Sequence, residues 1–195
     1  MEYLRQGKLE VYCGPMFSSK TRSLVARVDP LRWTHGHEFI FIKPDVDKRQ
    51  EKTRGDPLDY AKWNYVKTRE PLQVLELVKP EHTLVAIDEI QFFPDTIIPV
   101  LEKMLAQSRN IVVAGFDLDF KGDPFGIMPY LLAIADRVTK LTAVCTECGN
   151  PATRTQRLIH GEPADYNSPL VMIEGDAQYE PRCLQHHYVP GKPGI

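Results

Sequence analysis

Residues 14–21 read GPMFSSKT, which departs at one position from the phosphate-binding pattern G-x-x-x-x-G-K-[ST]. Ser19 stands where the pattern has its second glycine. Backbone N–H groups of such a loop surround an anion, and the dipole of the following helix favours negative charge there. The loop therefore predicts a nucleoside triphosphate site. The residues expected at the phosphates are Gly14, Pro15, Met16, Phe17, Ser18, Ser19, Lys20 and Thr21, with the Thr21 hydroxyl on magnesium.

An acidic pair, Asp88 and Glu89, directly follows the apolar run 84–87. Ligands of open α/β sheets bind at the carboxyl ends of strands, so Asp88 is predicted to hold magnesium, directly or through water. Glu89 is a candidate base. An exposed turn after a strand is the alternative, and the phosphate loop upstream favours the site.

Two short clips near the C-terminus have the spacing of a tetrahedral zinc site. They are Cys145-x-x-Cys148 and Cys183-x-x-His186. His187 competes for the fourth position, and the two-residue spacer favours His186. Four protein ligands leave the ion no open position, so the predicted zinc is structural; free reduced cysteines are the alternative.

The composition is that of a soluble globular protein, with 43% hydrophobic and 26% charged residues in a chain of 195. The formal net charge of -2 argues against a dedicated nucleic-acid binder. No apolar run approaches the roughly 20 residues of a membrane span, and the first residues lack the apolar stretch of a signal peptide. We therefore expect a cytoplasmic protein without disulfides, in which Cys13 is a core residue.

Apolar runs alternate with helix-like stretches through the first 140 residues, which predicts an α/β fold with a mostly parallel sheet covered on both faces. The expected strands are Leu9–Cys13, Glu38–Ile42, Trp63–Val66, Thr83–Asp88 and Asn110–Phe116. The expected helices are Thr21–Thr34, Pro71–Leu77, Asp95–Gln107 and Ile127–Ala135.

The composition changes after Lys140, where the chain becomes rich in proline, glycine and polar residues. We place a domain boundary there, between a nucleotide-binding domain (1–140) and a zinc-binding subdomain (141–195). A strand is expected at Val138–Val144, with short β pieces at Thr153–Leu158 and Leu170–Ile173.

Five segments, taken together and in order, resemble the thymidine kinases of the cellular, zinc-containing type. They are GPMFSSKT, IDEIQFF, DFKGDPFG, LTAVCTECGNPATRTQRL and YEPRCLQHH. The resemblance spans Gly7 to Gly191. It implies a P-loop, RecA-like parallel sheet flanked by helices, with a small zinc subdomain whose lasso loop covers the nucleoside. It also implies transfer of the ATP γ-phosphate to the 5′-hydroxyl of thymidine or deoxyuridine with magnesium, in a homotetramer.

The resemblance further implies roles for individual residues. Asp88 matches the magnesium-associated carboxylate, Glu89 the proposed general base, and Gln91 follows them at the ATP site. The residues matched to the nucleoside, or to the phosphates near it, are Met16, Asp47, Arg49, Phe116, Phe120, Val171, Ile173 and Tyr179. For Phe116 and Phe120, ordinary core packing is the alternative.

Two positions depart from the family pattern. The Cβ of Ser19 replaces a glycine beside the phosphates, which is expected to weaken nucleotide binding rather than abolish it. Glu174 stands where relatives often have glycine. Because of Ser19, a non-catalytic nucleotide-binding protein on the same fold is the main alternative function, and the intact Lys20 and Thr21 argue against it.

A third reading is an ATPase that acts on DNA through its zinc module. The net charge and the acidic residues between the two clips disfavour it. The expected partners are thereby thymidine and ATP, without nucleic acid or membrane.

Overall fold

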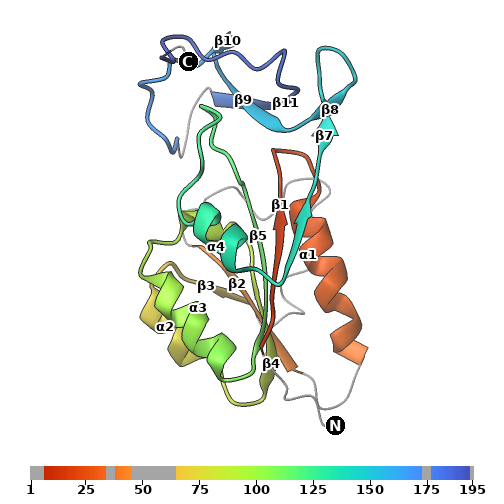
Figure 1. Cartoon of the computed structure of the whole chain (residues 1–195), viewed down its shortest axis with the longest axis vertical. Coiled ribbons are helices and arrows are strands. Elements are labelled where there is room, and N and C mark those ends of the chain that lie inside the picture. The colour runs from red at the N-terminus through yellow and green to blue at the C-terminus, as the bar shows by residue number, and fades with distance from the viewer. Residues whose placement is uncertain (1–6, 34–37, 45–64, 173–176, 194–195) are drawn as a thin grey trace.

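The computed structural model describes residues 7–33, 38–44, 65–172 and 177–193. Its centre is a six-stranded sheet in the order β3-β2-β4-β5-β1-β6, and every neighbouring pair is parallel (Figure 1). The strands are β1 (Leu9–Cys13), β2 (Glu38–Lys43), β3 (Tyr65–Lys67), β4 (His82–Ile87), β5 (Asn110–Gly115) and β6 (Arg137–Lys140). The predicted α/β fold with a parallel sheet is confirmed.

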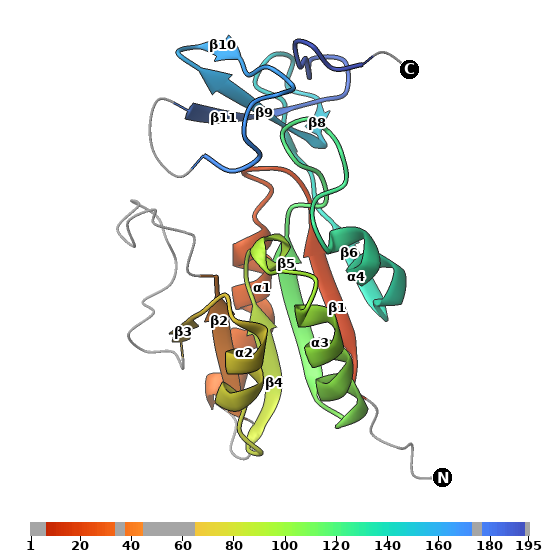
Figure 2. The same ribbon diagram turned by 90° about the vertical axis from the view of Figure 1, so that its left-hand side faces the viewer.

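Helices cover both faces of this sheet (Figures 1 and 2). One face carries α1 (Lys20–Val28), and the opposite face carries α2 (Pro71–Leu77), α3 (Ile97–Ala106) and α4 (Met128–Ile134). A short 3₁₀ turn, η3 (Ile90–Phe92), follows β4. Apart from β2 and β3, between which residues 45–64 are not described, strands and helices alternate along the chain up to β6 as the sequence predicts.

The first helix is shorter than predicted. The expected helix Thr21–Thr34 is α-helical only to Val28, and a 3₁₀ helix, η1, occupies Asp29–Trp33. Pro30 explains the change, because proline lacks the N–H of the α-helical ladder and its ring crowds the preceding turn. Thr34 lies outside the described residues.

Beyond β6 the chain forms two small antiparallel sheets at one end of the molecule, near the carboxyl end of β1 (Figure 1). One pairs β7 (Ala143–Val144) with β8 (Pro151–Ala152), so the expected strand Val138–Val144 is in fact divided between β6 and β7. The other has the order β10-β9-β11, with β9 at Arg154–Ile159, β10 at Glu162–Pro163 and β11 at Ala177–Arg182.

The predicted strand Leu170–Ile173 is wrong in its described part, because residues 170–172 belong to no strand. Ile173 lies outside the described residues. The position beside β9 is taken by β11 instead. The division of the chain into domains at residue 140 stays a prediction.

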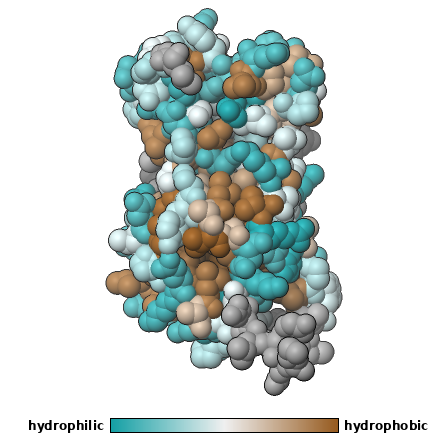
Figure 3. Space-filling model, in the orientation of Figure 1, coloured by the Kyte–Doolittle hydropathy of each residue, from teal (hydrophilic) through white to brown (hydrophobic). Residues whose placement is uncertain are grey.

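Part of the surface over α4 is hydrophobic (Figure 3). Tyr130 and Ile134 of α4 and Val138 of the edge strand β6 all expose a substantial fraction of their side chains. Among the described residues, no helix is long and apolar enough to span a membrane.

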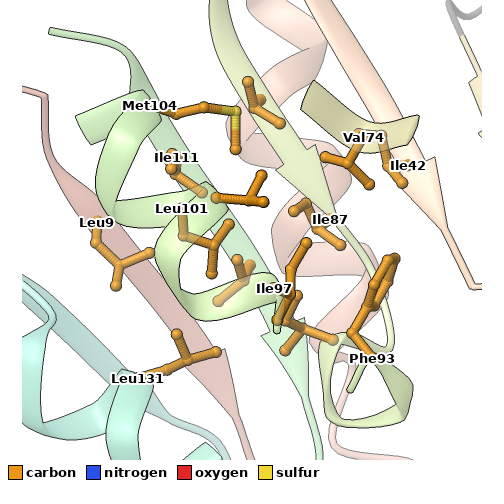
Figure 4. Close-up of a cluster of buried hydrophobic side chains, with 14 of the residues drawn as sticks. Leu9, Ile42, Val74, Ile87, Phe93, Ile97, Leu101, Met104, Ile111 and Leu131 are labelled. Carbon is orange, nitrogen blue, oxygen red and sulfur yellow. The ribbon is translucent and has the colours of Figure 1, made fainter. Parts of the chain in front are cut away.

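Alternation along the strands builds two hydrophobic layers. In β4, Leu84 and Ala86 point to the α1 side, where they join Leu24 of that helix. Val85 and Ile87 point to the other layer, which Figure 4 shows packed with side chains of α2 and α3. Each fully buried aliphatic side chain contributes roughly 1.5–3 kcal/mol. The buried sheet thereby holds the carboxyl ends of its strands, and the residues that follow them, in fixed positions.

Candidate functional site

The loop between β1 and α1 has an unusual backbone. Gly14, Phe17 and Ser19 all have positive φ, of 144°, 61° and 66°. A Cβ on Gly14 would lie 2.4 Å from the Leu141 carbonyl oxygen, so only glycine fits there. Ser19 is the N-cap of α1 and is left-handed, with ψ 28°. The one residue that departs from the phosphate-loop pattern therefore has the conformation that glycine adopts with least strain.

Side chains of the same loop fold back on its backbone. The Ser18 hydroxyl and the Lys20 ammonium donate to the Pro15 carbonyl oxygen at 2.8 and 2.7 Å. The Lys20 nitrogen also lies 3.8 Å from the centroid of the Phe116 ring. Burial lowers the pKa of Lys20, and the nearby carboxylates, chiefly Glu89, act in the opposite direction. A buried cation thus lies at the start of α1, beside the carboxyl ends of β1 and β5.

Thr21 and Asp88 meet although β4 and α1 are distant in sequence. The Thr21 hydroxyl donates to both carboxylate oxygens of Asp88, at 3.0 and 3.2 Å. Asp88 is 2% exposed, and its N–H donates to the Ile42 carbonyl oxygen at 2.9 Å. Burial raises the pKa of Asp88, and the Glu89 carboxylate adds to the rise. A hydroxyl and a carboxylate so placed can ligate a hard cation, which offsets the cost of the buried charge.

Glu89 is held in place by Gln91. The Gln91 side-chain amide donates to the Glu89 carboxylate at 2.6 Å, and its oxygen accepts the Phe116 N–H at 3.1 Å. Glu89 itself has a left-handed backbone, with φ 52°. This conformation turns the chain sharply after Asp88. Gln91 thereby links the residues that follow β4 to those that follow β5.

Two further residues at this site were not predicted. Asp117 follows β5 by two residues, is buried, and lies 2.8 Å from the Lys140 ammonium. The rule that ligands gather at strand ends could have identified it. The Met16 N–H donates to the Thr155 hydroxyl at 2.9 Å, which joins the loop to β9. Nothing in the local sequence indicates that second contact.

The residues expected around the base are brought together only in part. Phe116 and Phe120 are buried. The Arg157 guanidinium lies 3.8 Å from the centroid of the Phe120 ring and 5.4 Å from that of Tyr179. Val171 is 40% exposed and not packed in the core. Asp47, Arg49, Ile173 and Glu174 lie outside the described residues. Sequence reasoning missed Arg157, since an arginine in a short strand is ordinarily a surface residue.

The predicted metal ligands form one compact cluster. One ligand atom from each of Cys145, Cys148, Cys183 and His186 lies within 4.8 Å of all the others. The Cys148 and Cys183 sulfurs are 3.8 Å apart, and the Cys183 sulfur is 3.2 Å from His186 Nδ1. Tetrahedral zinc with Zn–S bonds of about 2.3 Å requires sulfur separations of about 3.8 Å. The donor set and the spacing both fit a zinc ion.

Local backbone groups favour the thiolate form of Cys145. Desolvation opposes ionisation of Cys145, but N–H groups of Cys183 and Cys148 outweigh it and lower the pKa of Cys145 to about 7. By contrast, burial raises the pKa of Cys13 to about 11, as expected for a core thiol. The cluster geometry, together with the lowered pKa of Cys145, separates the three candidate ligands from the buried core thiol Cys13.

His187, the competing ligand, has another partner. Its Nε2 lies 2.9 Å from the Phe120 carbonyl oxygen, and the residue is absent from the cluster. Burial lowers the pKa of His187. The two adjacent histidines thus point to different structures, His186 to the thiols and His187 to the loop that carries Phe120.

Comparison with known proteins gives a consistent result over nearly the whole chain. The family model described as thymidine kinase matches residues 7–188. A thymidine kinase of Coprothermobacter proteolyticus is 46% identical over 193 residues, which cover 98% of this chain and 96% of the relative. The phosphate loop, the acidic pair and the Cys/His cluster all fall within the matched region. The chain therefore belongs to the thymidine kinase family.

Proposed function

We propose that this chain transfers the γ-phosphate of ATP to the 5′-hydroxyl of thymidine or deoxyuridine. The observation that carries the proposal is the junction of Thr21 with Asp88 beside the buried Lys20, in a chain of the thymidine kinase family. Phosphoryl transfer needs little covalent chemistry from the protein, and depends on alignment and on compensation of phosphate charge. The described site offers groups for both.

The phosphate loop and Asp88 bind different parts of the magnesium–ATP complex in this proposal. Residues 14–21 bind the phosphates through backbone N–H groups, and Lys20 supplies a positive charge. Thr21 and Asp88 would hold magnesium, which neutralises charge on the phosphate oxygens when it is bound. The buried, mutually bonded geometry of this pair supports its assignment, since each oxygen is already oriented by a partner.

Glu89 is the proposed general base. It accepts the proton of the attacking 5′-hydroxyl, a contribution typically worth about 10²–10⁴ in rate. The hydrogen bond from Gln91 supports this role, because it fixes the direction of the carboxylate. The Gln91 side-chain oxygen in turn accepts a hydrogen bond from the Phe116 N–H, so Gln91 positions both the proposed base and a residue of the proposed nucleoside pocket.

The nucleoside is proposed to lie between the two parts of the chain. Phe116, Phe120 and Tyr179 supply aromatic surface for a pyrimidine, and Met16 is assigned to the same pocket by resemblance. Backbone groups near Val171 satisfy the polar edge of the base. A pocket of this kind rejects a base that leaves its polar groups unpaired. Asp47, Arg49 and Ile173 are assigned to the substrates by resemblance alone.

Zinc is proposed to be structural. Four protein ligands leave no position for a substrate, and the cluster joins the β7–β8 hairpin to the segment after β11. Residues 141–195 are accordingly proposed to form a subdomain that closes over the nucleotide-binding domain 1–140. The bond from Met16 to Thr155 supports a fixed relation between the two.

We also propose that the protein is a cytoplasmic homotetramer. Support for assembly comes from the hydrophobic side chains exposed on α4 and β6, because contiguous apolar surface commonly marks an interface (Figure 3). Light scattering on the purified protein measures the mass directly. A monomer at micromolar concentration would contradict the proposal.

A coupled ADP assay with ATP, magnesium and thymidine tests the activity. We expect ADP release that requires thymidine and is lost in Lys20→Met. Lys103→Met removes an exposed lysine of α3 and serves as the matched control. ATP binding without thymidine-dependent turnover would favour the non-catalytic alternative, and DNA-dependent ADP release would favour the ATPase.

A further inference from the structure

Arg157 is a charged residue in an unusually buried position. It lies in β9 and is 2% exposed. Its two terminal nitrogens donate to consecutive backbone carbonyl oxygens, those of Pro169 and Leu170, both at 2.5 Å. Such a bidentate contact uses the planar fork of a guanidinium. The side chain thereby fixes the backbone that leads directly to Val171.

The faces of the same guanidinium meet aromatic rings. The centroid of the Phe120 ring lies 3.8 Å from the Cζ atom of Arg157, a distance typical of a strong cation–π contact. Tyr179 is the cross-strand partner of Arg157 in the β9–β11 pair, and its ring centroid is at 5.4 Å. Arg157 therefore contacts three separate segments of chain at once, and each carries a residue assigned to the nucleoside.

Fold stability alone does not explain this arrangement. A buried guanidinium costs free energy unless all its donors are paired, and an apolar side chain of similar volume ordinarily serves a core at lower cost. The Nε of Arg157 is buried without a hydrogen-bond partner among the described atoms, so this cost is not fully offset. The arginine instead fixes positions, because the planar guanidinium holds two carbonyl oxygens and two aromatic rings in place around it.

We propose that Arg157 is a positioning residue for the nucleoside, which sets the shape of the pocket by holding Phe120, Tyr179 and the Pro169–Leu170 backbone in one arrangement. The inference rests on the proposed function, because it takes the two rings as pocket walls. The bonds that shape the phosphate loop, from Lys20 to Pro15 and from Thr21 to Asp88, do not include Arg157. Loss of Arg157 therefore acts on thymidine and not on ATP.

The test compares Arg157→Met and Arg157→Lys with the wild type. We expect Arg157→Met to raise KM for thymidine about tenfold or more, while KM for ATP changes by less than about twofold. Discrimination between thymidine and deoxycytidine should fall as well. Arg157→Lys keeps the charge but not the fork, so it should recover only a small part of the loss. Arg154→Met, in the same strand but less buried, is the matched control and should leave both KM values near wild type.

Several results would overturn the inference. Unchanged KM for thymidine in Arg157→Met would remove its role, as would equal increases in both KM values. If Arg157→Met fails to fold, Arg157→Lys provides the test, through the change in its KM for thymidine relative to the change in its KM for ATP. Loss of zinc and of ATP binding in both variants would show that Arg157 supports the whole fold instead. If the wild type shows no thymidine-dependent ADP release, the proposed function fails first, and this inference falls with it.

Discussion

The Lys20 ammonium donates to the carbonyl oxygen of Pro15, five residues earlier, at 2.7 Å. Ser18 donates to the same oxygen, so two side chains close the loop on itself. Ser19, between them, is thereby kept in a left-handed conformation that its Cβ disfavours. The loop shape is set by these bonds and not by the backbone preference of residue 19.

Ser19→Gly should stabilise the loop and tighten ATP binding. A left-handed conformation costs a residue with a Cβ about 1–2 kcal/mol, which the change to glycine removes. The greater freedom of glycine in the unfolded chain offsets about 0.5–1 kcal/mol of this gain in stability. We expect a small rise in the melting temperature of the free protein. We also expect a gain in ATP affinity of up to about tenfold, or about 1.4 kcal/mol. Thermal unfolding and ATP titration at fixed magnesium measure both.

Ser23→Gly is the matched control for this change. Ser23 lies inside α1, where its N–H donates to the Ser19 carbonyl oxygen at 2.9 Å. Glycine there should lower stability by about 0.5–1 kcal/mol. Weaker ATP binding in Ser19→Gly would show that the serine side chain itself contacts the nucleotide, and would contradict the assignment of strain.

Glu89→Gln should lower kcat by about two orders of magnitude and leave ATP affinity within a few-fold of wild type. The amide has the same shape and still accepts the hydrogen bond from Gln91, but it cannot take a proton. Steady-state kinetics with thymidine and ATP, together with direct ATP titration, separate the two effects. Near-normal turnover would exclude Glu89 as the base.

Asp88→Asn should stabilise the protein free of nucleotide and metal, and more so at higher pH. Burial raises the pKa of Asp88 to about 7, from an ordinary value of 3.8, with a further contribution from Glu89. The folded state thus binds the proton more tightly, so the stability that Asp88 contributes is present below about pH 4 and is lost as pH rises through about 7. Asparagine resembles the protonated form at every pH.

Thermal unfolding of wild type and Asp88→Asn from pH 5 to pH 8 measures this difference. It should be smallest at pH 5, grow up to about pH 7 and change little from there to pH 8. Magnesium with ATP should then stabilise the wild type more than the variant at pH 8, since only the wild type keeps the proposed metal ligand. A difference in melting temperature that stays constant with pH would disprove the titration of Asp88 in this range.

Purified protein should contain about one zinc per chain. Cys145→Ser should lose the metal and unfold at lower temperature, because structural zinc contributes directly to folding free energy. Cys13→Ala is the matched control, since Cys13 lies in β1 and outside the Cys/His cluster. Elemental analysis checks the metal content. Freshly purified protein without zinc would refute the metal assignment.

The strands and helices of the large sheet could be predicted because each has a strong local signal. β1 and α2 have the predicted bounds, and β4 differs by one residue at each end. These segments are apolar runs bounded by turn residues, which fixes their type and nearly fixes their ends. The phosphate loop and the two metal clips were predicted from their own residue patterns, without reference to the family.

The small sheet was predicted only in part. Its central strand β9 (Arg154–Ile159) lies one residue beyond the expected Thr153–Leu158, but β11 was missed because its signal is not local. β11 reads AQYEPR, has little apolar alternation, and contains a proline that cannot donate to the ladder. The sequence instead predicts a strand at the more apolar segment 170–173, of which residues 170–172 form no strand. The carbonyl oxygen of Leu170 instead accepts a hydrogen bond from Arg157, a residue distant in the chain. Contacts such as Met16 to Thr155 likewise depend on tertiary packing and leave no pattern in either segment.

The strand order also dictates when the sheet can form during synthesis. β1 is made well before its two neighbours in the sheet, β5 and β6, at residues 110–115 and 137–140. The nascent chain therefore carries β1 without either partner until residues 110–140 have been made. Such distant parallel pairing is slow, and it exposes apolar strands meanwhile. A chain truncated before β5 would present the residues of β1, including the approach to the phosphate loop, as unpaired and aggregation-prone.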